Sequence, residues 1–402
     1  MISNSGIGSE RIAGAPQGLA LIVTSTLPIT PLLSLVSNVP QLFQHFAGVA
    51  HSNVLVPMIL TMPSACIALL APGAGTLLDR FGRRRVLLAA VLLYTVCGLL
   101  PLGLNTLPAV LMAQIGVGVG EAIIMPACQT LMGDFFQPEE RQRWLGVQGV
   151  LGSILATAVV LGGGALGTLS WHAPFLMNLI GAVSFVWLLF WTWEPARSGG
   201  GGVEGLPAQA FPWRAMSRIF LVTIPISLLY FIQTVQLGVI FSKLGAVSPA
   251  LISVLTTVAS IGVMIGGWWF RQQKRVNPQK HLALILLSYG IGLTGLALSS
   301  SYLSGLGFAV VAQFGNGLTV PVLVGWALGT LDFKYRGRGM GLWTTCFFVG
   351  QFLSPMLLAG IVHERGGDFL SAIAAVGIFC AVASAIVWLL GARRGRAAAA
   401  AA

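Results

Sequence analysis

The sequence has 402 residues, of which 56% are hydrophobic and only 8% are charged. A soluble domain averages about 25% charged residues, so this composition excludes a water-soluble protein. In a soluble protein the net charge of +11 would suggest a nucleic-acid partner. Here the basic residues fall in short segments between apolar runs, so we expect the lipid bilayer as a partner and no nucleic acid.

The apolar runs have about the 20 residues that a helix needs to cross a bilayer. Short segments of alternating hydrophobicity, which a membrane β-barrel would show, do not occur in the sequence. Gly and Pro within the runs do not argue against helices, because membrane helices tolerate both. We therefore predict an all-α integral membrane protein with twelve spans, at residues 17–37, 54–76, 86–104, 107–132, 146–167, 174–193, 218–241, 248–270, 282–300, 303–331, 340–361 and 369–391.

Basic residues predict the orientation, because cytoplasmic loops carry an excess of Lys and Arg. Of the 22 Lys and Arg residues, only Lys243 and Arg365 fall in segments that alternate to the outside. We therefore expect a multi-pass protein of the plasma (inner) membrane with both termini in the cytoplasm.

Two charged segments between spans carry a recognisable pattern. The segment after the second span reads Gly75-x-Leu77-x-Asp79-Arg80-x-Gly82-Arg83-Arg84-Arg85, and the segment after the fourth span is FQPEERQRWLG, residues 136–146. The first resembles the signature of the major facilitator superfamily between helices two and three, and the second resembles that family's loop after helix four. The resemblance implies a secondary transporter whose twelve helices form two pseudo-symmetric bundles of six.

The resemblance also implies a conformational latch at the cytoplasmic face. In the family, the equivalent of Asp79 lies against the N-terminus of helix eleven, where the helix dipole favours a carboxylate, and the equivalents of Arg83 and Asp134 complete a charge relay. Such contacts would stabilise the outward-facing state. The alternative for Asp79 is helix capping or simple anchoring by charge. The expected latch residues are Gly75, Asp79, Arg80, Gly82, Arg83, Asp134, Arg141 and Arg336.

Glu121 is the one acidic residue in the middle of a predicted span, and no Lys, Arg or His lies at the same depth. An ionised carboxylate in the hydrocarbon region costs several kcal/mol, so it faces a water-filled cavity or carries a proton. Gln114 lies seven residues earlier, on the same helical face. We predict that Glu121 couples transport to protons; the alternative is a protonated structural glutamate that bonds to a neighbouring helix.

The longest polar stretch predicts a boundary between two halves. It is rich in Gly and Pro, as a flexible linker is. The pattern Arg141-x-Arg143-x-x-Gly146 recurs 195 residues later, from Arg336 to Gly341, as a parallel repeat of two six-helix units would require; coincidence between basic loops is the alternative. We expect an N-terminal bundle at 1–193, a linker at 194–217, a C-terminal bundle at 218–396 and a tail at 397–402.

Polar and aromatic side chains recur at helical spacing in several spans. In the family, helices one, four, seven and ten line a central cavity, and packing within a bundle is the alternative role. The expected cavity residues are Thr26, Gln114, Tyr230, Gln233, Gln236, Gln313, Asn316, Trp343, Phe347 and Gln351. Without a Lys or Arg in mid-membrane, this cavity suits a neutral or cationic substrate rather than a phosphate or dicarboxylate.

These features predict a proton-coupled exporter of small amphipathic molecules that works by alternating access. Two departures from the family's patterns weigh against a drug/proton antiporter: Met112 stands where helix four usually has Arg, and residues 158–164 keep the antiporter glycines but lack their Pro. The alternative is therefore a proton-linked importer of a neutral solute, such as a sugar or an aromatic metabolite.

Other classes fit less well. We expect no enzyme, because no cluster of His, Cys or acidic residues is available for catalysis, and a channel would not need the latch signature. The five cysteines lie within apolar runs without metal-like spacing, so we expect no metal and no cofactor. The expected partners are a small-molecule substrate, protons and the bilayer, and the expected state is a monomer.

Overall fold

The computed structural model describes residues 13–195, 213–273, 277–330 and 336–400. These residues form helices joined by short connections, and no strand occurs among them. Eleven helices or broken helices in this part are long and apolar enough to cross a membrane, and residues Ile154–Gly167 form a shorter apolar stretch. That stretch belongs to a 30-residue helix, α7, which corresponds to the predicted fifth span. The all-α membrane fold with twelve spans is therefore confirmed.

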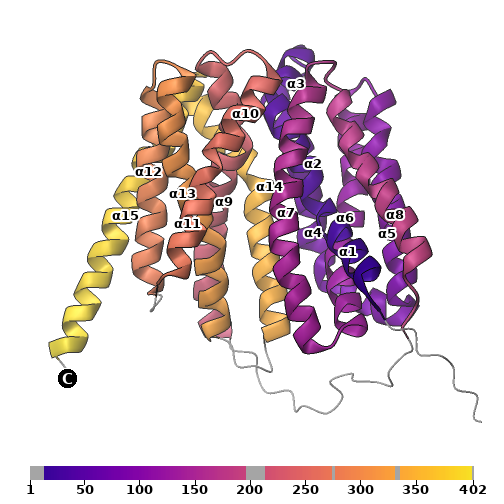
Figure 1. Cartoon of the computed structure of the whole chain (residues 1–402). Coiled ribbons are helices and arrows are strands. Elements are labelled where there is room, and N and C mark those ends of the chain that lie inside the picture. The colour runs from indigo at the N-terminus through magenta and orange to yellow at the C-terminus, as the bar shows by residue number, and fades with distance from the viewer. Residues whose placement is uncertain (1–12, 196–212, 274–276, 331–335, 401–402) are drawn as a thin grey trace, which may run out of the picture.

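The first half of the chain contributes six spans, which lie together in Figure 1. Their segments are α1 (Ala15–Ser25), η1 (Leu27–Ile29), α2 (Thr30–Leu35), η2 (Val36–Asn38), α3 (Val39–His45), α4 (Ser52–Phe81), α5 (Arg83–Leu99), η3 (Leu100–Gly103), α6 (Leu107–Phe135), α7 (Pro138–Gly167), η4 (Ala173–Asn178) and α8 (Leu179–Trp191).

The second half contributes the other six. They are α9 (Trp213–Lys243), α10 (Pro249–Ala259) with α11 (Ile261–Arg271), α12 (Pro278–Leu298), α13 (Tyr302–Thr330), α14 (Arg336–Glu364) and α15 (Phe369–Ala400). Most of the expected linker at 194–217 lies outside the described residues. The expected tail at 397–402 overlaps the end of α15.

Two spans that the sequence predicts as continuous are broken. The first runs from Ala15 to His45 in alternating α and 3₁₀ segments, four of which have Pro in the first turn. Proline lacks the N–H that a continuing helix needs, and it fits the first turn of a new segment. The eighth span breaks at Ser260, whose hydroxyl donates to the carbonyl of Thr256 at 2.9 Å, a local bond that competes with the helical ladder.

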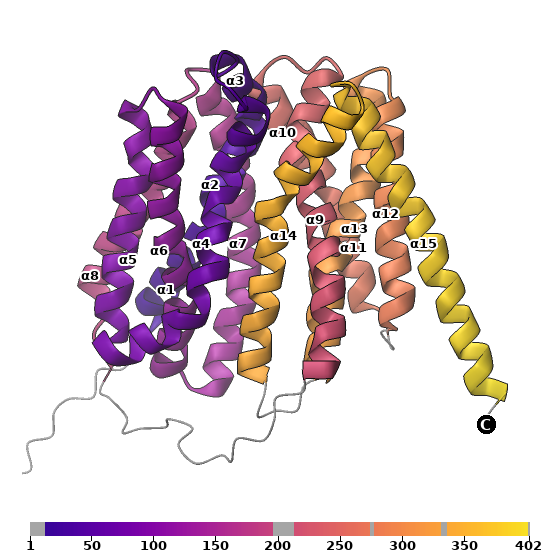
Figure 2. The same ribbon diagram turned by 180° about the vertical axis from the view of Figure 1, so that it is seen from behind.

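The two halves form two bundles that lie side by side (Figures 1 and 2). In the first, α6 packs against α4 and α5; in the second, α12 packs against α13 and α15. Between the bundles, α4 packs against α14, α7 against α10, and η2 against α9. Glycines permit the closest of these approaches: a Cβ on Gly164 would lie 2.3 Å from the Ser253 side chain, and one on Gly238 would lie 2.5 Å from the Val36 carbonyl oxygen.

The helix boundaries extend the repeat that the basic loops suggest. Helices α6 and α13 begin 195 residues apart, and α5 and α12 begin with the same offset. Both α6 and α13 contain a proline, Pro126 and Pro321, again at the same offset. This register assigns each residue of α5 and α6 a counterpart in α12 and α13.

Candidate functional site

A buried network of amide and hydroxyl groups lies between α9, α12 and α13. The side-chain nitrogen of Asn316 donates to the amide oxygens of Gln233 at 2.5 Å and Gln313 at 2.8 Å. The Tyr289 hydroxyl donates to the side-chain oxygen of Asn316 at 2.7 Å, and Thr319 lies 2.9 Å from the same hydroxyl. The structure thus brings three predicted cavity residues together. It adds Tyr289, which belongs to the ninth span and so lies outside the polar stripes of the seventh and tenth.

An aromatic cluster lies between α9 and α14. The rings of Trp343 and Phe347 stack with centroids 5.3 Å apart, and Tyr230 lies 5.6 Å from Phe347. The Ser227 hydroxyl donates to the carbonyl of Phe347 at 2.6 Å, which fixes the two helices against each other. The indole N–H of Trp343 is buried and has no partner in the described part of the chain, so it is available to a bound molecule.

Glu121 and Gln114 are buried in α6, with exposed fractions of 3% and 0%. One carboxyl oxygen of Glu121 and both amide atoms of Gln114 have no hydrogen-bond partner among the described residues. The titratable groups that interact electrostatically with Glu121 are Tyr94 and Cys66, neither of which is a base. Among the described residues, Glu121 therefore has neither a counter-charge nor a complete set of hydrogen bonds.

The repeat register gives Glu121 a counterpart in the second half. Glu121 corresponds to Asn316, and Tyr94 corresponds to Tyr289, each pair 195 residues apart. In the second half this tyrosine and amide bond directly to each other. In the first half the Tyr94 hydroxyl instead donates to the carbonyl of Leu27 at 3.2 Å and to Asn178 at 3.0 Å. A titratable carboxyl thus occupies the position at which the other bundle has a satisfied neutral amide.

The side chains of the remaining expected cavity residues form no hydrogen bond with these groups in the described part of the chain. The Thr26 hydroxyl donates to the carbonyl of Val23 at 2.7 Å, a bond within its own segment. Gln351 is buried in α14. Gln236 lines a separate cavity with residues of α3 and α14, although it is only three residues from Gln233.

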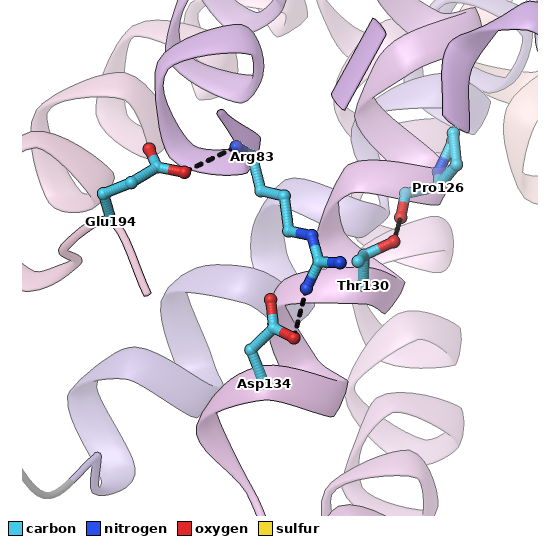
Figure 3. A network of polar contacts seen from close by, with 5 residues as sticks. All are labelled: Arg83, Pro126, Thr130, Asp134 and Glu194. Carbon is cyan, nitrogen blue, oxygen red and sulfur yellow. Dashed lines mark hydrogen bonds and ion pairs between the residues drawn. The ribbon is translucent and has the colours of Figure 1, made fainter. Parts of the chain in front are cut away.

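The charged segment after α4 forms a compact polar centre (Figure 3). The guanidinium of Arg83 pairs with the carboxylate of Asp134 at the end of α6. The carboxylate of Glu194, just after α8, accepts hydrogen bonds from the backbone N–H groups of Arg83 at 2.6 Å, Arg84 at 3.1 Å and Arg85 at 3.3 Å. Glu194 therefore caps the N-terminus of α5, as the free N–H groups and the dipole of a helix favour.

The geometry of this cap explains the glycine of the signature. Gly82 has φ +95°, and a Cβ there would lie 2.9 Å from a carboxyl oxygen of Glu194. Any other residue would strain the backbone and displace the carboxylate. Glu194 was not among the predicted latch residues, because 111 residues separate it from Arg83. An acid at the end of the sixth span was the available signal.

Other expected latch residues lie at the same end of the bundles. The Arg80 guanidinium lies 5.4 Å from the ring centroid of Phe81. A Cβ added to Gly75 on α4 or to Gly341 on α14 would have no described atom within 4 Å, whereas farther along these helices Thr345 donates to the carbonyl of Ala68 at 3.3 Å. The side chains of Asp79, Arg141 and Arg336 lie outside the described part of the structure.

Metal-binding geometry does not occur in the described part of the chain. It contains no group of three or more His, Cys, Asp or Glu side chains that would hold an ion. Its five cysteines are free thiols.

Comparisons with known proteins agree with the fold and the signature. Residues 20–278 match the sequence profile of the Major Facilitator Superfamily. The putative multidrug resistance protein MdtD of Pectobacterium carotovorum subsp. carotovorum (strain PC1) is 24% identical over 321 residues, which are 78% of this chain and 57% of that protein. The chain thus spans little more than half the length of this relative. The probable anion transporter 4, chloroplastic, of Arabidopsis thaliana is 32% identical over 36% of this chain and 26% of its own.

Solved structures share the arrangement of helices. A bacterial homolog of the human lysosomal transporter Spinster, in an inward-facing and occupied conformation, superposes with a TM-score of 0.73 at 16% identity, over 95% of this chain and 98% of its own. The POT family transporter PepTSo has a TM-score of 0.73 at 11% identity, over 93% and 98% of the two chains. At these identities the likeness concerns the fold alone.

Proposed function

Because the chain belongs to the Major Facilitator Superfamily, we propose that it is a proton-coupled exporter of small amphipathic molecules, neutral or cationic, that works by alternating access. The observation that carries the proposal is Glu121, a buried carboxyl with an unpartnered oxygen among the described residues, at the position where the second bundle has Asn316. An amide would fulfil a structural role there without the cost of burying a titratable group. A carboxyl in that position gains the ability to bind and release a proton.

The substrate class follows from the groups available for binding. Stacked aromatic rings at Trp343 and Phe347 suit a flat apolar or cationic molecule. The N–H of Trp343 and the amide nitrogen of Gln233, both without a partner in the described residues, offer hydrogen-bond donors. The name of the relative MdtD, a putative multidrug resistance protein, supports export of such compounds.

Alternating access requires the bundles to separate at one end while they meet at the other. Here α7 meets α10 and η2 meets α9, at the end of the molecule remote from the α8 terminus and the α9 start (Figure 2). At the opposite end, which the expected orientation places in the cytoplasm, a Cβ added to Gly75 or Gly341 would have no described atom within 4 Å. This arrangement supports an inward-facing state. Proton binding to Glu121 from one side and release to the other would bias the exchange between states.

A proton-linked importer of a neutral solute is the second candidate. The glycine run of α7, residues 162–164, lacks the proline of the antiporter pattern. If the chain is an importer, substrate and proton move in the same direction. Proton coupling through Glu121 is common to both candidates.

Direction is tested in membrane vesicles from cells that produce the protein. Everted vesicles, energised by respiration, should accumulate tetraphenylphosphonium above the level of vesicles without the protein, and a protonophore should abolish the difference. Right-side-out vesicles should show reduced accumulation. Protein-dependent uptake of a sugar or aromatic solute into right-side-out vesicles, with no effect on the cation in everted ones, would instead establish the importer.

A further inference from the structure

A cavity of about 500 Å³ lies between the two bundles. It lies at the outer end of the molecule, which is the end that the expected orientation places outside the cell. Helices α3 and α4 supply one wall from the first bundle, and α9, α14 and α15 supply the others from the second. Figure 2 shows the end of α14 and the start of α15 at the same end of the molecule as α3. The volume falls within the range of small-molecule sites, about 300–1,000 Å³.

One polar group of this cavity is buried without a partner. Gln236 is 3% exposed, and its amide oxygen has no hydrogen-bond donor among the described residues. An unsatisfied buried acceptor carries a desolvation penalty, so a donor that reaches it gains affinity. The wall around it is largely apolar, with Phe43, Leu358 and Phe369 among its members. A bound molecule with an N–H or O–H group would satisfy this oxygen.

A cation lies on the same face of α9. Lys243 follows Gln236 by seven residues, about two helical turns, and also lines the cavity. No carboxylate in the described part of the chain lies within ion-pair distance of Lys243. The Asp368 carboxylate, near the cavity wall at Phe369, accepts from the backbone N–H groups of Leu370 at 3.1 Å and Ser371 at 3.2 Å. It therefore caps α15 and does not neutralise the lysine.

We propose that this cavity binds a small amphipathic organic anion. Its carboxylate pairs with Lys243, its hydrogen-bond donor meets the Gln236 oxygen, and its apolar body packs on Phe43, Leu358 and Phe369. The site is distinct from the amide and aromatic groups between α9, α13 and α14. The cavity offers the positive charge of Lys243, whereas the buried site in α6 offers the carboxyl group of Glu121.

Occupancy has a consequence for transport. The cavity walls come from both bundles, which must separate at this end when the protein opens outward. A molecule that binds only the closed arrangement raises the population of that arrangement, relative to the others, by a factor of one plus the ratio of its concentration to its dissociation constant. The anion therefore acts as an inhibitor that holds the outer end shut. This inference does not depend on the direction of transport or on proton coupling.

The site is tested with 3-(4-hydroxyphenyl)propionate, which has a carboxylate, an aromatic body and a hydroxyl donor. Calorimetric titration of the full-length protein in phosphatidylcholine nanodiscs should show one saturable site. Because the Lys243 side chain is exposed, Lys243→Gln should weaken binding about twofold to fivefold, as the loss of a solvent-exposed ion pair predicts, and Lys243→Arg should retain it. Arg365→Gln, which removes an outer cation that does not line the cavity, should leave it unchanged. The neutral amide of the same compound should bind more weakly and with no dependence on Lys243.

Function gives a second readout. The anion should slow transport by the wild-type protein and by Arg365→Gln, but not by Lys243→Gln, whose transport without the anion should be normal. Equal affinity of wild type and Lys243→Gln, absence of saturable binding up to millimolar anion, or loss of binding on Phe347→Ala instead of Lys243→Gln would each overturn the proposal. None of these results bears on whether the protein exports its substrate.

Discussion

Glu121 shows how far a single residue can be interpreted from sequence. Its place in mid-membrane and the absence of a base at its depth are visible in the sequence alone. Its unpartnered oxygen, in the described part of the chain, and its correspondence to Asn316 emerge only when helix boundaries fix the repeat register. Contact partners cannot be derived from the sequence, because neighbours in the bundle such as Tyr94 come from other helices.

Replacing Glu121 with Gln keeps the shape of the side chain but removes its titration. We predict that Glu121→Gln loses proton-driven accumulation of substrate and retains exchange of labelled for unlabelled substrate across the membrane. Both are measured in proteoliposomes, with and without a pH gradient. Glu364→Gln, which changes an exposed acid at the end of α14, is the matched control and should behave as the wild type. A Glu121→Gln protein that still concentrates substrate with the wild-type pH dependence would show that Glu121 is structural.

Gly82 is a second residue with a definite physical requirement. Its positive φ and its distance from Glu194 predict that Gly82→Ala destabilises the protein by about 1–3 kcal/mol, through backbone strain and displacement of the cap. Glu194→Ala alone should cost about 1 kcal/mol, the typical effect of losing a capping side chain. Thermal unfolding in detergent measures both.

The double variant separates strain from contact. With Glu194 replaced by Ala, the Cβ that Gly82→Ala introduces no longer meets a carboxylate, so the double variant should lose less stability than the two separate losses combined. Gly73→Ala is the control, because Gly73 lies inside α4 and a Cβ there would have no described neighbour within 4 Å. A Gly82→Ala melting temperature equal to that of Gly73→Ala would contradict the capping account.

At the scale of elements, the positions of the membrane spans were predictable from the sequence, but the interruptions within the spans were not. Apolar runs place the twelve spans because hydrophobic length is a property of the sequence itself. The interruption at Ser260 depends on a local hydroxyl bond, and α4 accommodates Pro57, Pro63 and Pro72 within one continuous helix. A proline or serine alone therefore does not predict where a membrane helix ends.

The sequence predicted only in part which side chains on one helix share the same contacts. Gln233 and Gln236 were expected to share a face, but residues three apart differ by about 60° around the axis and by about 4.5 Å along it. That difference is enough for Gln233 to meet Asn316 while Gln236 lines the outer cavity. Spacing predicts which residues are neighbours on one helix, but the packing of other helices decides which neighbours they share.

We predict a latch that depends on the elements α4, α5 and α14 together. If Asp79 stabilises the outward-facing state by contact with the start of α14, then Asp79→Asn should shift the population toward the inward-facing state and slow net transport. The measurement is the distance between spin labels at positions 143 and 272, which the expected topology places at the cytoplasmic ends of the two bundles. The distance distribution should lengthen in Asp79→Asn and stay unchanged in Glu364→Gln. Unchanged distances together with normal transport would exclude the latch.

At the scale of the whole molecule, the sequence predicts twelve spans and a repeat, and the structure adds how the halves meet. The 195-residue offset was visible in the basic loops, and the starts of α6 and α13 repeat it. The contacts of α7 with α10 and of η2 with α9 were not predictable, because they arise between bundles and use small residues such as Gly164 and Gly238. The outer cavity was unpredictable for the same reason.

The central claim is that substrate and proton move in opposite directions through one protein. It is tested most directly by proton flux in proteoliposomes that contain the purified protein and an internal pH indicator, with no gradient other than that of an amphipathic cation added outside. As the cation enters through the protein, protons should leave, so the interior should become more alkaline, and liposomes without protein should show no change. Acidification of the interior on addition of substrate, or substrate entry without any change in pH, would contradict the account.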